Sequence, residues 1–151
     1  MENKKNRARA IIFKDNKIVA MYRERDNRVF YTFPGGGAEE GETLQECVVR
    51  EVFEEFGLTV QPIKQVYIYE SQYNIEHFFI CRWIGGEFGS GSGEEFDTNN
   101  TNGIYIPSLI DIDKIPNLPL MPPEIAKEFV IDYATNKEEL TNTIKHLYRQ
   151  D

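Results

Sequence analysis

The segment "PGGGAEEGETLQECVVREVFEEFGL" (residues 34–58) joins three consecutive glycines to a strongly acidic stretch. Within it, Thr43 is typical of a helix N-cap, and Glu46 three residues later completes the spacing of a capping box. Apolar residues then recur at helical spacing as far as Phe56, and Gly57 suits the position just after a helix. The segment therefore predicts a glycine turn followed directly by an amphipathic helix.

Three glutamates of this helix, Glu51, Glu54 and Glu55, stand at positions i, i+3 and i+4 and therefore share one face. Like charges at this spacing repel by roughly 0.2–0.5 kcal/mol per pair. They also lie near the C-terminal end of the helix, where the helix dipole disfavours negative charge. Oxygen ligands clustered on one face are what Mg²⁺ or Mn²⁺ requires, so the pattern indicates a divalent-cation site.

The glycines and Arg50 fit the same interpretation. Glycine lets the backbone approach closely and presents N–H and carbonyl groups beside the helix, and no Gly-Lys-Ser/Thr follows that would make this a P-loop. Arg50 can orient a neighbouring carboxylate through a bidentate ion pair. The structural alternative is that an acid-rich helix face is only solvated surface and that the glycines are only a turn. The joint spacing of the two features favours a site.

The spacing from Gly36 to Leu58 resembles the Nudix box, G-x5-E-x7-R-E-U-x-E-E-x-G-U, in which U is a bulky aliphatic residue. Gly36 and Glu42 occupy the first two fixed positions, and the run "REVFEEFGL" (residues 50–58) supplies all the others. The preceding "FPGG" and the strand-like segments around the box are also similar to the family. The resemblance extends over about residues 7–134.

This resemblance to Nudix (MutT-like) hydrolases implies a fold and a reaction. The fold class is α/β (α+β), an α/β/α sandwich with a mixed central sheet and a loop–helix–loop box that binds magnesium. The reaction is hydrolysis of a nucleoside diphosphate linked to another moiety X, with cleavage within the diphosphate. By position in the box, the metal ligands would be the carboxylates of Glu51, Glu54 and Glu55 and the backbone carbonyl of Gly35.

The same resemblance implies the catalytic roles. One of the box glutamates, Glu54 or Glu51, or an acid on a later loop such as Glu95, would orient and deprotonate the attacking water. Arg50 and Glu42 would mainly orient the other groups. The metal would be Mg²⁺ or Mn²⁺, which neutralises charge on the diphosphate and lowers the pKa of bound water.

Four further residues have both a functional and a structural interpretation. Glu95, in the Gly-, Ser- and Asn-rich segment 85–103, could supply a metal ligand or base, and a solvated acid is equally consistent with such a loop. Arg23 could reach a substrate phosphate, although a surface salt bridge is commoner. Phe30 could stack on a base. Tyr73 lies 15 residues after the box, near where relatives acting on dinucleoside polyphosphates carry a tyrosine, but tyrosines are common in strands.

The length of 151 residues fits one domain. A hairpin is expected over residues 8–25, and further strands in "VFYTF", "QVYIYES", "NIEHFFICRWI" and "IYIP". Two C-terminal helices are expected in "PPEIAKEFVIDYA" and "KEELTNTIKHLY", the second because Leu140, Ile144 and Leu147 recur at helical spacing. We therefore predict a single domain over residues 1–151, with a common core over about 7–134 and an extra C-terminal helix over about 137–149.

The net charge of −8 argues against binding to a nucleic-acid backbone or an anionic membrane, so we expect a small nucleotide-type partner. No apolar run approaches the ~20 residues of a membrane span, and the first ten residues lack the apolar region of a signal peptide. Cys47 and Cys81 show no zinc-ligand spacing and indicate a reduced, cytoplasmic protein, with Cys47 at a packing position. Oligomeric state stays open, with a homodimer as one option.

Two alternatives come from other functional classes. A catalytically silent Nudix-fold domain could bind a nucleotide or a partner protein, although the intact box argues against it. A calcium-binding module is disfavoured because the alternating Asp/Asn loop of an EF-hand is absent. The moiety X stays open among nucleoside triphosphates, oxidised nucleotides, nucleotide sugars and dinucleoside polyphosphates. No proline stands at the offset that would suggest ADP-ribose.

Overall fold

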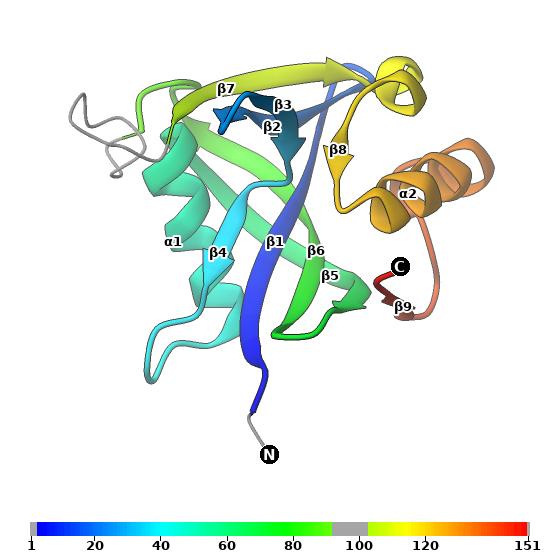
Figure 1. The fold of residues 1–151 in the computed structure, drawn as a ribbon. Coiled ribbons are helices and arrows are strands. Elements are labelled where there is room, and N and C mark those ends of the chain that lie inside the picture. The colour runs from blue at the N-terminus through cyan, green and yellow to red at the C-terminus, as the bar shows by residue number, and fades with distance from the viewer. Residues whose placement is uncertain (1–2, 92–102, 151) are drawn as a thin grey trace.

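The computed structural model describes residues 3–91 and 103–150. Within these residues, helices α1 (Leu44–Phe56) and α2 (Pro123–Asn136) lie on opposite sides of one curled, mixed sheet (Figure 1). The predicted α+β class and mixed central sheet are confirmed. The strands are β1 (Lys5–Lys14), β2 (Lys17–Arg25), β3 (Arg28–Thr32), β4 (Gly35–Gly37), β5 (Leu58–Glu70), β6 (Asn74–Gly86), β7 (Ile104–Asp111), β8 (Leu120–Met121) and β9 (Lys145–Tyr148).

The sheet follows the order β8-β3-β2-β1-β6-β5-β9, with β4 paired to β1 and β7 paired to β2. Three pairs are parallel: β1 with β6, β3 with β8, and β5 with β9. The hairpin of β1 and β2 is antiparallel, as the turn residues between the two strands predicted. Strands β5 and β6 form a second, long antiparallel hairpin. In this order β1 stands at the centre of the sheet, between β2 and β6, and also carries β4.

Two hydrophobic clusters lie on the two faces of the sheet. Strand β1 contributes alternate side chains to each cluster, because successive side chains of a strand point to opposite faces. The cluster that includes α1 contains Ala8, Ala10, Ile12, Val48, Val52, Phe56 and Phe79. The cluster that includes α2 contains Ile11, Phe33, Tyr67, Phe78, Ile125 and Phe129. Each helix therefore packs on its own face of the sheet.

The predicted ends of α1 are confirmed. The Thr43 side chain accepts a hydrogen bond from the Glu46 N–H at 3.0 Å, and the Glu46 carboxylate accepts one from the Thr43 N–H at 2.9 Å. This reciprocal pair is the capping box. Gly57 has a φ of 75°, a left-handed conformation that favours glycine, and its N–H donates to the Phe53 carbonyl.

The three glycines form a strand, whereas the sequence predicted a turn. Strand β4 pairs antiparallel with β1, so that Gly37 lies opposite Arg7, Gly36 opposite Ala8 and Gly35 opposite Arg9. Glycine is unfavourable in most strands, but it is found where another backbone or side chain approaches closely. This arrangement fixes the glycine backbone beside α1 (Figure 1).

The predicted C-terminal helix over residues 137–149 is wrong. A short 3₁₀ segment η3 (Lys137–Glu139) is followed by strand β9, which pairs with β5. Leu140 has a φ of 55°, and the Thr141 hydroxyl accepts a hydrogen bond from the Thr143 N–H, a local turn that competes with a helix. Leu140 is buried and Leu147 packs on the core, but Ile144 is 50% exposed, so their helical spacing is coincidental.

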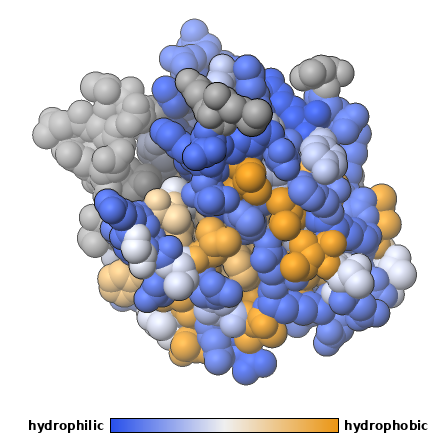
Figure 2. All heavy atoms as spheres, turned by 90° about the horizontal axis from the view of Figure 1, so that it is seen from below, coloured by the Kyte–Doolittle hydropathy of each residue, from blue (hydrophilic) through white to orange (hydrophobic). Residues whose placement is uncertain are grey.

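Seen from below, the surface is mostly hydrophilic, with hydrophobic side chains gathered towards its centre (Figure 2). Within the described ranges 3–91 and 103–150, no helix combines the length and apolar composition needed to cross a bilayer. Glu94, Glu95 and most of the loop predicted over 85–103 lie outside the described residues. The connection from β7 to β8 passes through a short 3₁₀ segment, η2 (Ile112–Asn117).

A buried polar cluster ties the C-terminal elements to the sheet. The Tyr67 hydroxyl of β5 donates to Asp132 of α2 at 2.7 Å, and Lys145 of β9 donates to the same carboxylate at 2.7 Å. Asp132 is 4% exposed, so its hydrogen bonds replace water. Because a buried acceptor that loses its donor is costly, this cluster stabilises the packing of α2 and β9 on β5.

We expect Tyr67→Phe to lower the free energy of unfolding by about 1–3 kcal/mol, since it leaves one Asp132 oxygen without that donor. For a protein of this size the melting temperature falls by roughly 2–4 °C per kcal/mol. Thermal melts in EDTA measure the change. Tyr73→Phe is the control, because Tyr73 is 62% exposed. Equal melting temperatures for the two variants would contradict the role of this cluster.

Candidate active site

A cleft of about 240 Å³ opens where β4 meets α1. We call it the glycine cleft. It brings together the glycine strand, two glutamates of α1 and three arginines from β1 and β2. Its lining residues are Arg7, Arg9, Met21, Arg23, Thr32, Gly35, Gly36, Gly37, Glu51, Glu55 and Tyr105.

The glycine backbone lies directly against two carboxylates of α1. The Gly35 N–H donates to Glu55 Oε1 at 2.8 Å, and Glu55 is only 7% exposed. A Cβ atom added to Gly36 would lie 2.6 Å from Glu51 Oε1, closer than real Cβ atoms approach other atoms. Any side chain at Gly36 would therefore push the Glu51 carboxylate out of its place. The lack of side chains on β4 is what allows this contact.

Arg50 connects the carboxylates of the box. Its guanidinium makes a bidentate pair with Glu42, at 2.7 Å from Nε and 3.0 Å from Nη2. Its Nη1 lies 3.1 Å from Glu51 Oε1 and 3.2 Å from Glu54 Oε2. The repulsion expected among the glutamates of α1 is therefore partly offset by one cation, and the orienting role predicted for Arg50 has a geometric basis.

Two pKa shifts follow from this network. The hydrogen bond from Arg50 lowers the pKa of Glu42 to about 2. Cys47 is buried, its thiol donates to the Gly36 carbonyl at 3.5 Å, and burial together with nearby carboxylates raises its pKa to about 11. Glu42 is therefore ionised at neutral pH, and Cys47 is a neutral packing residue, as its sequence position predicted.

Arg9 forms the opposite wall of the glycine cleft. Its Nε donates to Glu76 of β6 at 2.8 Å, and its Nη1 donates to the carbonyls of Phe33 and Gly35 at 3.0 Å each. The arginine side chain is 15% exposed, and that of Glu76 is 14% exposed. This fixed geometry presents a guanidinium directly beside the glycine strand.

Two more arginines line the same wall. Burial and the neighbouring Arg9 lower the pKa of Arg7. The Arg23 guanidinium lies over the ring of Tyr105, 3.7 Å from its centroid, and 5.4 Å from that of Phe30. A chain with net charge −8 thus gathers three cations opposite its acidic helix. Such a wall suits an anionic ligand.

The oxygen-rich side of the cleft fits a hard divalent cation by its donor chemistry. Glu51 and Glu55 line it, and the space beside Gly36 that a Cβ would fill is held open for the Glu51 carboxylate. Among the described residues, however, no three Asp, Glu, His or Cys side chains stand ready as a metal cluster. The Arg50 Nη1 atom lies between two carboxylates of α1, 3.1 Å from Glu51 Oε1 and 3.2 Å from Glu54 Oε2.

Comparison with known proteins places the chain in a family. The family model described as NUDIX domain matches residues 4–107. The chain belongs to the NUDIX domain family. The ADP-ribose pyrophosphatase of Methanocaldococcus jannaschii is 40% identical over 103 residues, which are 60% of this chain and 60% of that protein. The NAD-capped RNA hydrolase NudC of Chromobacterium violaceum is 34% identical over 104 residues, 66% of this chain and 35% of that protein.

Solved structures agree on the fold. The NUDIX hydrolase from Nitrosomonas europaea superposes with a TM-score of 0.74 at 16% identity, covering 99% of this chain and 81% of that one. At this identity the likeness concerns the fold alone. The chain spans less than two thirds of the length of the two relatives named above, so their activities describe those proteins.

The structure brings together only part of the predicted Nudix site. Gly35, Glu51, Glu55 and Arg23 line the glycine cleft, although the Gly35 carbonyl accepts a hydrogen bond from Arg9. The Glu54 side chain lies beside the cleft, 42% exposed and paired with Arg50. Gly35, Glu51, Glu54 and Glu55 are the positions where the resemblance to the Nudix box expects the metal ligands, and Arg23 is expected to reach a substrate phosphate. These roles remain predictions.

Three residues with weaker functional predictions, Phe30, Tyr73 and Glu95, do not line the glycine cleft as the structure describes it. Phe30 lies near the Arg23 guanidinium but does not line the glycine cleft. Tyr73 is 62% exposed in the turn between β5 and β6 and also lies outside the cleft. Tyr73 therefore lies away from the glycine cleft, and its role in substrate binding stays a prediction. Glu95 lies outside the described residues.

Sequence reasoning missed Arg7 and Arg9. Both stand on β1 at alternate positions, whereas Ala8 and Ala10 between and beside them are fully buried. The alternation "RARA" was the available signal, because it places two cations on one face of a strand whose other face is core. Their partner Glu76 comes from a strand more than sixty residues away, so no local pattern reveals it.

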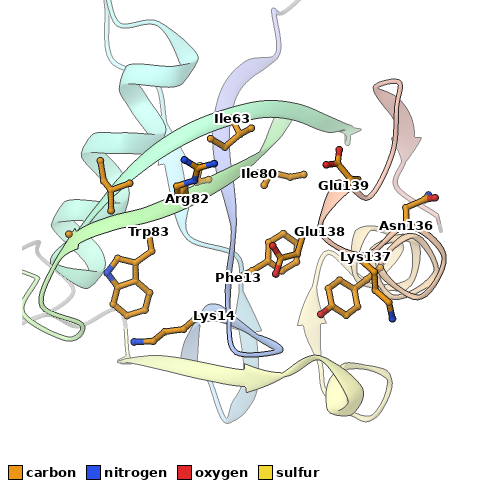
Figure 3. Close-up of a pocket in the computed structure, with 14 residues that line it drawn as sticks. Phe13, Lys14, Ile63, Ile80, Arg82, Trp83, Asn136, Lys137, Glu138 and Glu139 are labelled. Atoms are coloured by element: carbon orange, nitrogen blue, oxygen red, sulfur yellow. The ribbon is translucent and has the colours of Figure 1, made fainter.

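A larger cavity lies elsewhere, between β5, the end of β6 and segment η3. It measures about 1010 Å³ and is lined by Phe13, Lys14, Trp83 and Glu138 among others (Figure 3). Lys14 reaches to 4.1 Å from the centroid of the Trp83 ring. No residue of the Nudix box lines this cavity. Size alone therefore does not identify the active site of this Nudix domain.

We expect Gly36→Ala to reduce hydrolytic activity at least about tenfold, because the new Cβ displaces the Glu51 carboxylate. Gly37→Ala is the matched control, since its Cβ would meet only Arg7 Nη1, at 4.0 Å. Steady-state kinetics with circular dichroism as a check on folding measure the difference. Equal activity of the two variants would mean that the position of Glu51 against Gly36 is unimportant.

We expect Glu42→Gln to lower the free energy of unfolding at pH 7 by about 1.5–3 kcal/mol, since a charge-assisted pair with Arg50 is lost. The pKa of Glu42 is depressed in the folded protein, so its stabilisation is present above about pH 4.5 and disappears as the pH falls towards 2. Urea unfolding in EDTA at several pH values tests this. Glu40→Gln, at an exposed position, is the control. A difference between variant and wild type that persists at the lowest pH would contradict the assignment.

Proposed function

We propose that this protein is a Mg²⁺- or Mn²⁺-dependent Nudix hydrolase that cleaves the diphosphate of a nucleoside diphosphate linked to another moiety. The observation that carries the proposal is the glycine cleft. It sets Glu51 and Glu55 against one wall and Arg7, Arg9 and Arg23 against the other. Carboxylates bind divalent cations, and guanidinium groups bind phosphate oxygens, so the two walls together suit a metal-bound diphosphate.

The divalent cation, when bound, would neutralise phosphate charge and lower the pKa of a bound water. Glu51, Glu54, Glu55 and the Gly35 carbonyl would hold it. The arginines would hold the diphosphate in line for attack, because hydrolysis of this bond depends mostly on position and electrostatics. Arg50 would keep the box carboxylates in their orientation.

One glutamate must accept the proton of the attacking water. Glu54 is the first candidate, because its side chain is the most exposed of the Arg50-linked carboxylates on α1. Glu95 is the second, on sequence grounds only. The pair of variants Glu54→Gln and Glu95→Gln separates them, since loss of the base lowers kcat more than it raises KM.

The first substrate class to test is a nucleoside diphosphate joined to a sugar. The relative at 40% identity is named for ADP-ribose, and a second relative is named for NAD-capped RNA. The proline typical of ADP-ribose hydrolases is missing at its offset, so ADP-ribose is a candidate rather than an assignment. We would test ADP-ribose in one panel of substrates together with nucleotide sugars, nucleoside triphosphates, oxidised nucleotides and dinucleoside polyphosphates.

The proposal also places the protein in the cytoplasm, acting on small nucleotides rather than on nucleic acid or membrane. The net charge of −8 supports this, because long anionic polymers are repelled. Including NAD-capped RNA among the test substrates shows whether the protein also acts on nucleic acid. Oligomeric state is left open, with a homodimer as one option.

We expect the wild type to hydrolyse at least one member of the panel with Mg²⁺ or Mn²⁺ and to lose that activity in excess EDTA. Glu54→Gln should lower kcat by on the order of 10²-fold, the scale for losing one well-placed electrostatic group. Its stability in EDTA should change little, because Arg50 keeps its bidentate pair with Glu42. Product identification by mass spectrometry locates the broken bond.

Full hydrolysis in EDTA would overturn the metal requirement. Tight nucleotide binding with no turnover of any panel member would instead support the catalytically silent domain. Activity with Ca²⁺ but not with Mg²⁺ or Mn²⁺ would reopen the calcium alternative.

A further inference from the structure

Arg23 of β2 stands directly opposite an aromatic residue on each neighbouring strand. The pairing of β2 with β7 sets Arg23 opposite Tyr105, and the pairing of β2 with β3 sets it opposite Phe30. Residues directly opposite each other in adjacent strands project to the same face of a sheet, where their side chains meet. One face of the sheet therefore carries a cationic side chain between two aromatic ones, and the cation lines the glycine cleft.

The guanidinium of Arg23 lies closer to Tyr105 than to Phe30. Its Cζ atom is 3.7 Å from the centroid of the Tyr105 ring and 5.4 Å from that of the Phe30 ring. An arginine that points an N–H group at a ring holds its Cζ farther from the centroid, so the shorter distance indicates a guanidinium that lies flat on the Tyr105 ring. Tyr105 also lines the glycine cleft, whereas Phe30 does not.

The Tyr105 ring is itself held by packing. It is half-buried against the hydrophobic cluster that includes α1, to which its cleft neighbour Met21 also belongs. An arginine side chain loses much rotamer freedom when it is ordered, and this cost weakens ligand binding when it falls on the binding step. By ordering Arg23 before a ligand arrives, the fixed ring of Tyr105 reduces that cost.

Contact with a ring face orients a guanidinium and leaves its donors able to bind a ligand. The N–H groups of arginine lie in the plane of the guanidinium, whereas a stacked ring touches only the face of that plane. A stacked arginine can therefore still donate to two phosphate oxygens at once. Arg9 is held in a different way, because Glu76 and two backbone carbonyls accept hydrogen bonds from its N–H groups.

We propose that Tyr105 is a positioning residue, which holds the Arg23 guanidinium flat against its ring and so orients it toward the phosphate oxygens of the substrate. The inference rests on the proposed function, because it takes the diphosphate to lie in the glycine cleft. Tyr105 acts through Arg23, so its ring matters for activity only while Arg23 is present.

Direct stacking of Tyr105 on a nucleobase is disfavoured. Arg23 already covers one face of the ring at 3.7 Å, and the ring packs on the hydrophobic cluster that includes α1. A base would have to displace the guanidinium, and the cation–π contact would be lost. Both arrangements predict that loss of the ring lowers activity, so the test must remove Arg23 as well.

Kinetic variants test whether Tyr105 acts through Arg23. For the panel member that the wild type hydrolyses best, we expect Tyr105→Leu to lower kcat/KM about tenfold, mainly through a higher KM. Tyr105→Phe should restore most of the loss, because the ring is kept. In the Arg23→Gln background, Tyr105→Leu should lower kcat/KM by less than about twofold, since the two residues act as one unit.

Phe88→Leu is the matched control. Phe88 is an aromatic residue packed on the same hydrophobic cluster as Tyr105, but it lies outside the glycine cleft. The variant therefore loses a ring of similar size without disturbing Arg23. It should leave kcat/KM at the wild-type value.

An NMR measurement observes the contact itself in the absence of substrate. The Nε–H proton of Arg23, assigned by its loss in Arg23→Gln, should resonate upfield of the Nε–H protons of other arginines, because the ring current of Tyr105 shields it. The upfield shift should vanish in Tyr105→Leu and persist in Tyr105→Phe.

The outcomes separate this inference from the proposed function. An equal loss of activity on Tyr105→Leu with and without Arg23 would overturn the positioning role, since Tyr105 would then act on its own. A loss that Tyr105→Phe does not restore, or an Arg23 signal without the upfield shift, would also overturn it. If the wild type hydrolyses no panel member, the proposed function itself is overturned, and the role inferred for Tyr105 falls with it.

Discussion

The approach of helix α1 to a strand without side chains determines the geometry of this site. Strand β4 consists of Gly35, Gly36 and Gly37, and it is pinned to β1 by antiparallel pairing. Because no Cβ intervenes, Glu51 lies against Gly36 and Glu55 accepts the Gly35 N–H. The carboxylates are thus positioned by rigid backbone rather than by flexible side chains, and pre-organised donors of this kind cost little rearrangement when a ligand binds.

Charge on the two walls follows from the same arrangement. The glycine strand lies between the acidic face of α1 and the arginines of β1 and β2, so opposite charges lie close together in the glycine cleft. On the acidic side, Arg50 pairs with the carboxylates of α1 and is itself held by an ion pair with Glu42. A cation shared by Glu51 and Glu54 would compete with Arg50 for these oxygens, which links metal binding to the position of one guanidinium.

Much of the helix and its chemistry could be predicted from the sequence. The capping box at Thr43, the end at Gly57 and the acidic face are local patterns, and local patterns are what spacing reveals. The β4 strand could not be predicted, because its pairing with β1 is long-range and glycine favours turns. The prediction of a C-terminal helix was wrong for a similar reason. The pairing of β9 with β5 is long-range, and it determines the local structure in spite of the apparent helical spacing of the apolar residues.

The central claim is that the box glutamates and the glycine strand hold a divalent cation. The most direct measurement is a crystal structure with Mn²⁺, in which anomalous scattering locates the metal. The account predicts a peak within coordination distance of Glu51 and Glu54 or Glu55, with the Arg50 guanidinium moved from between Glu51 and Glu54. A structure in which Arg50 keeps its place and manganese binds only away from α1 would contradict it.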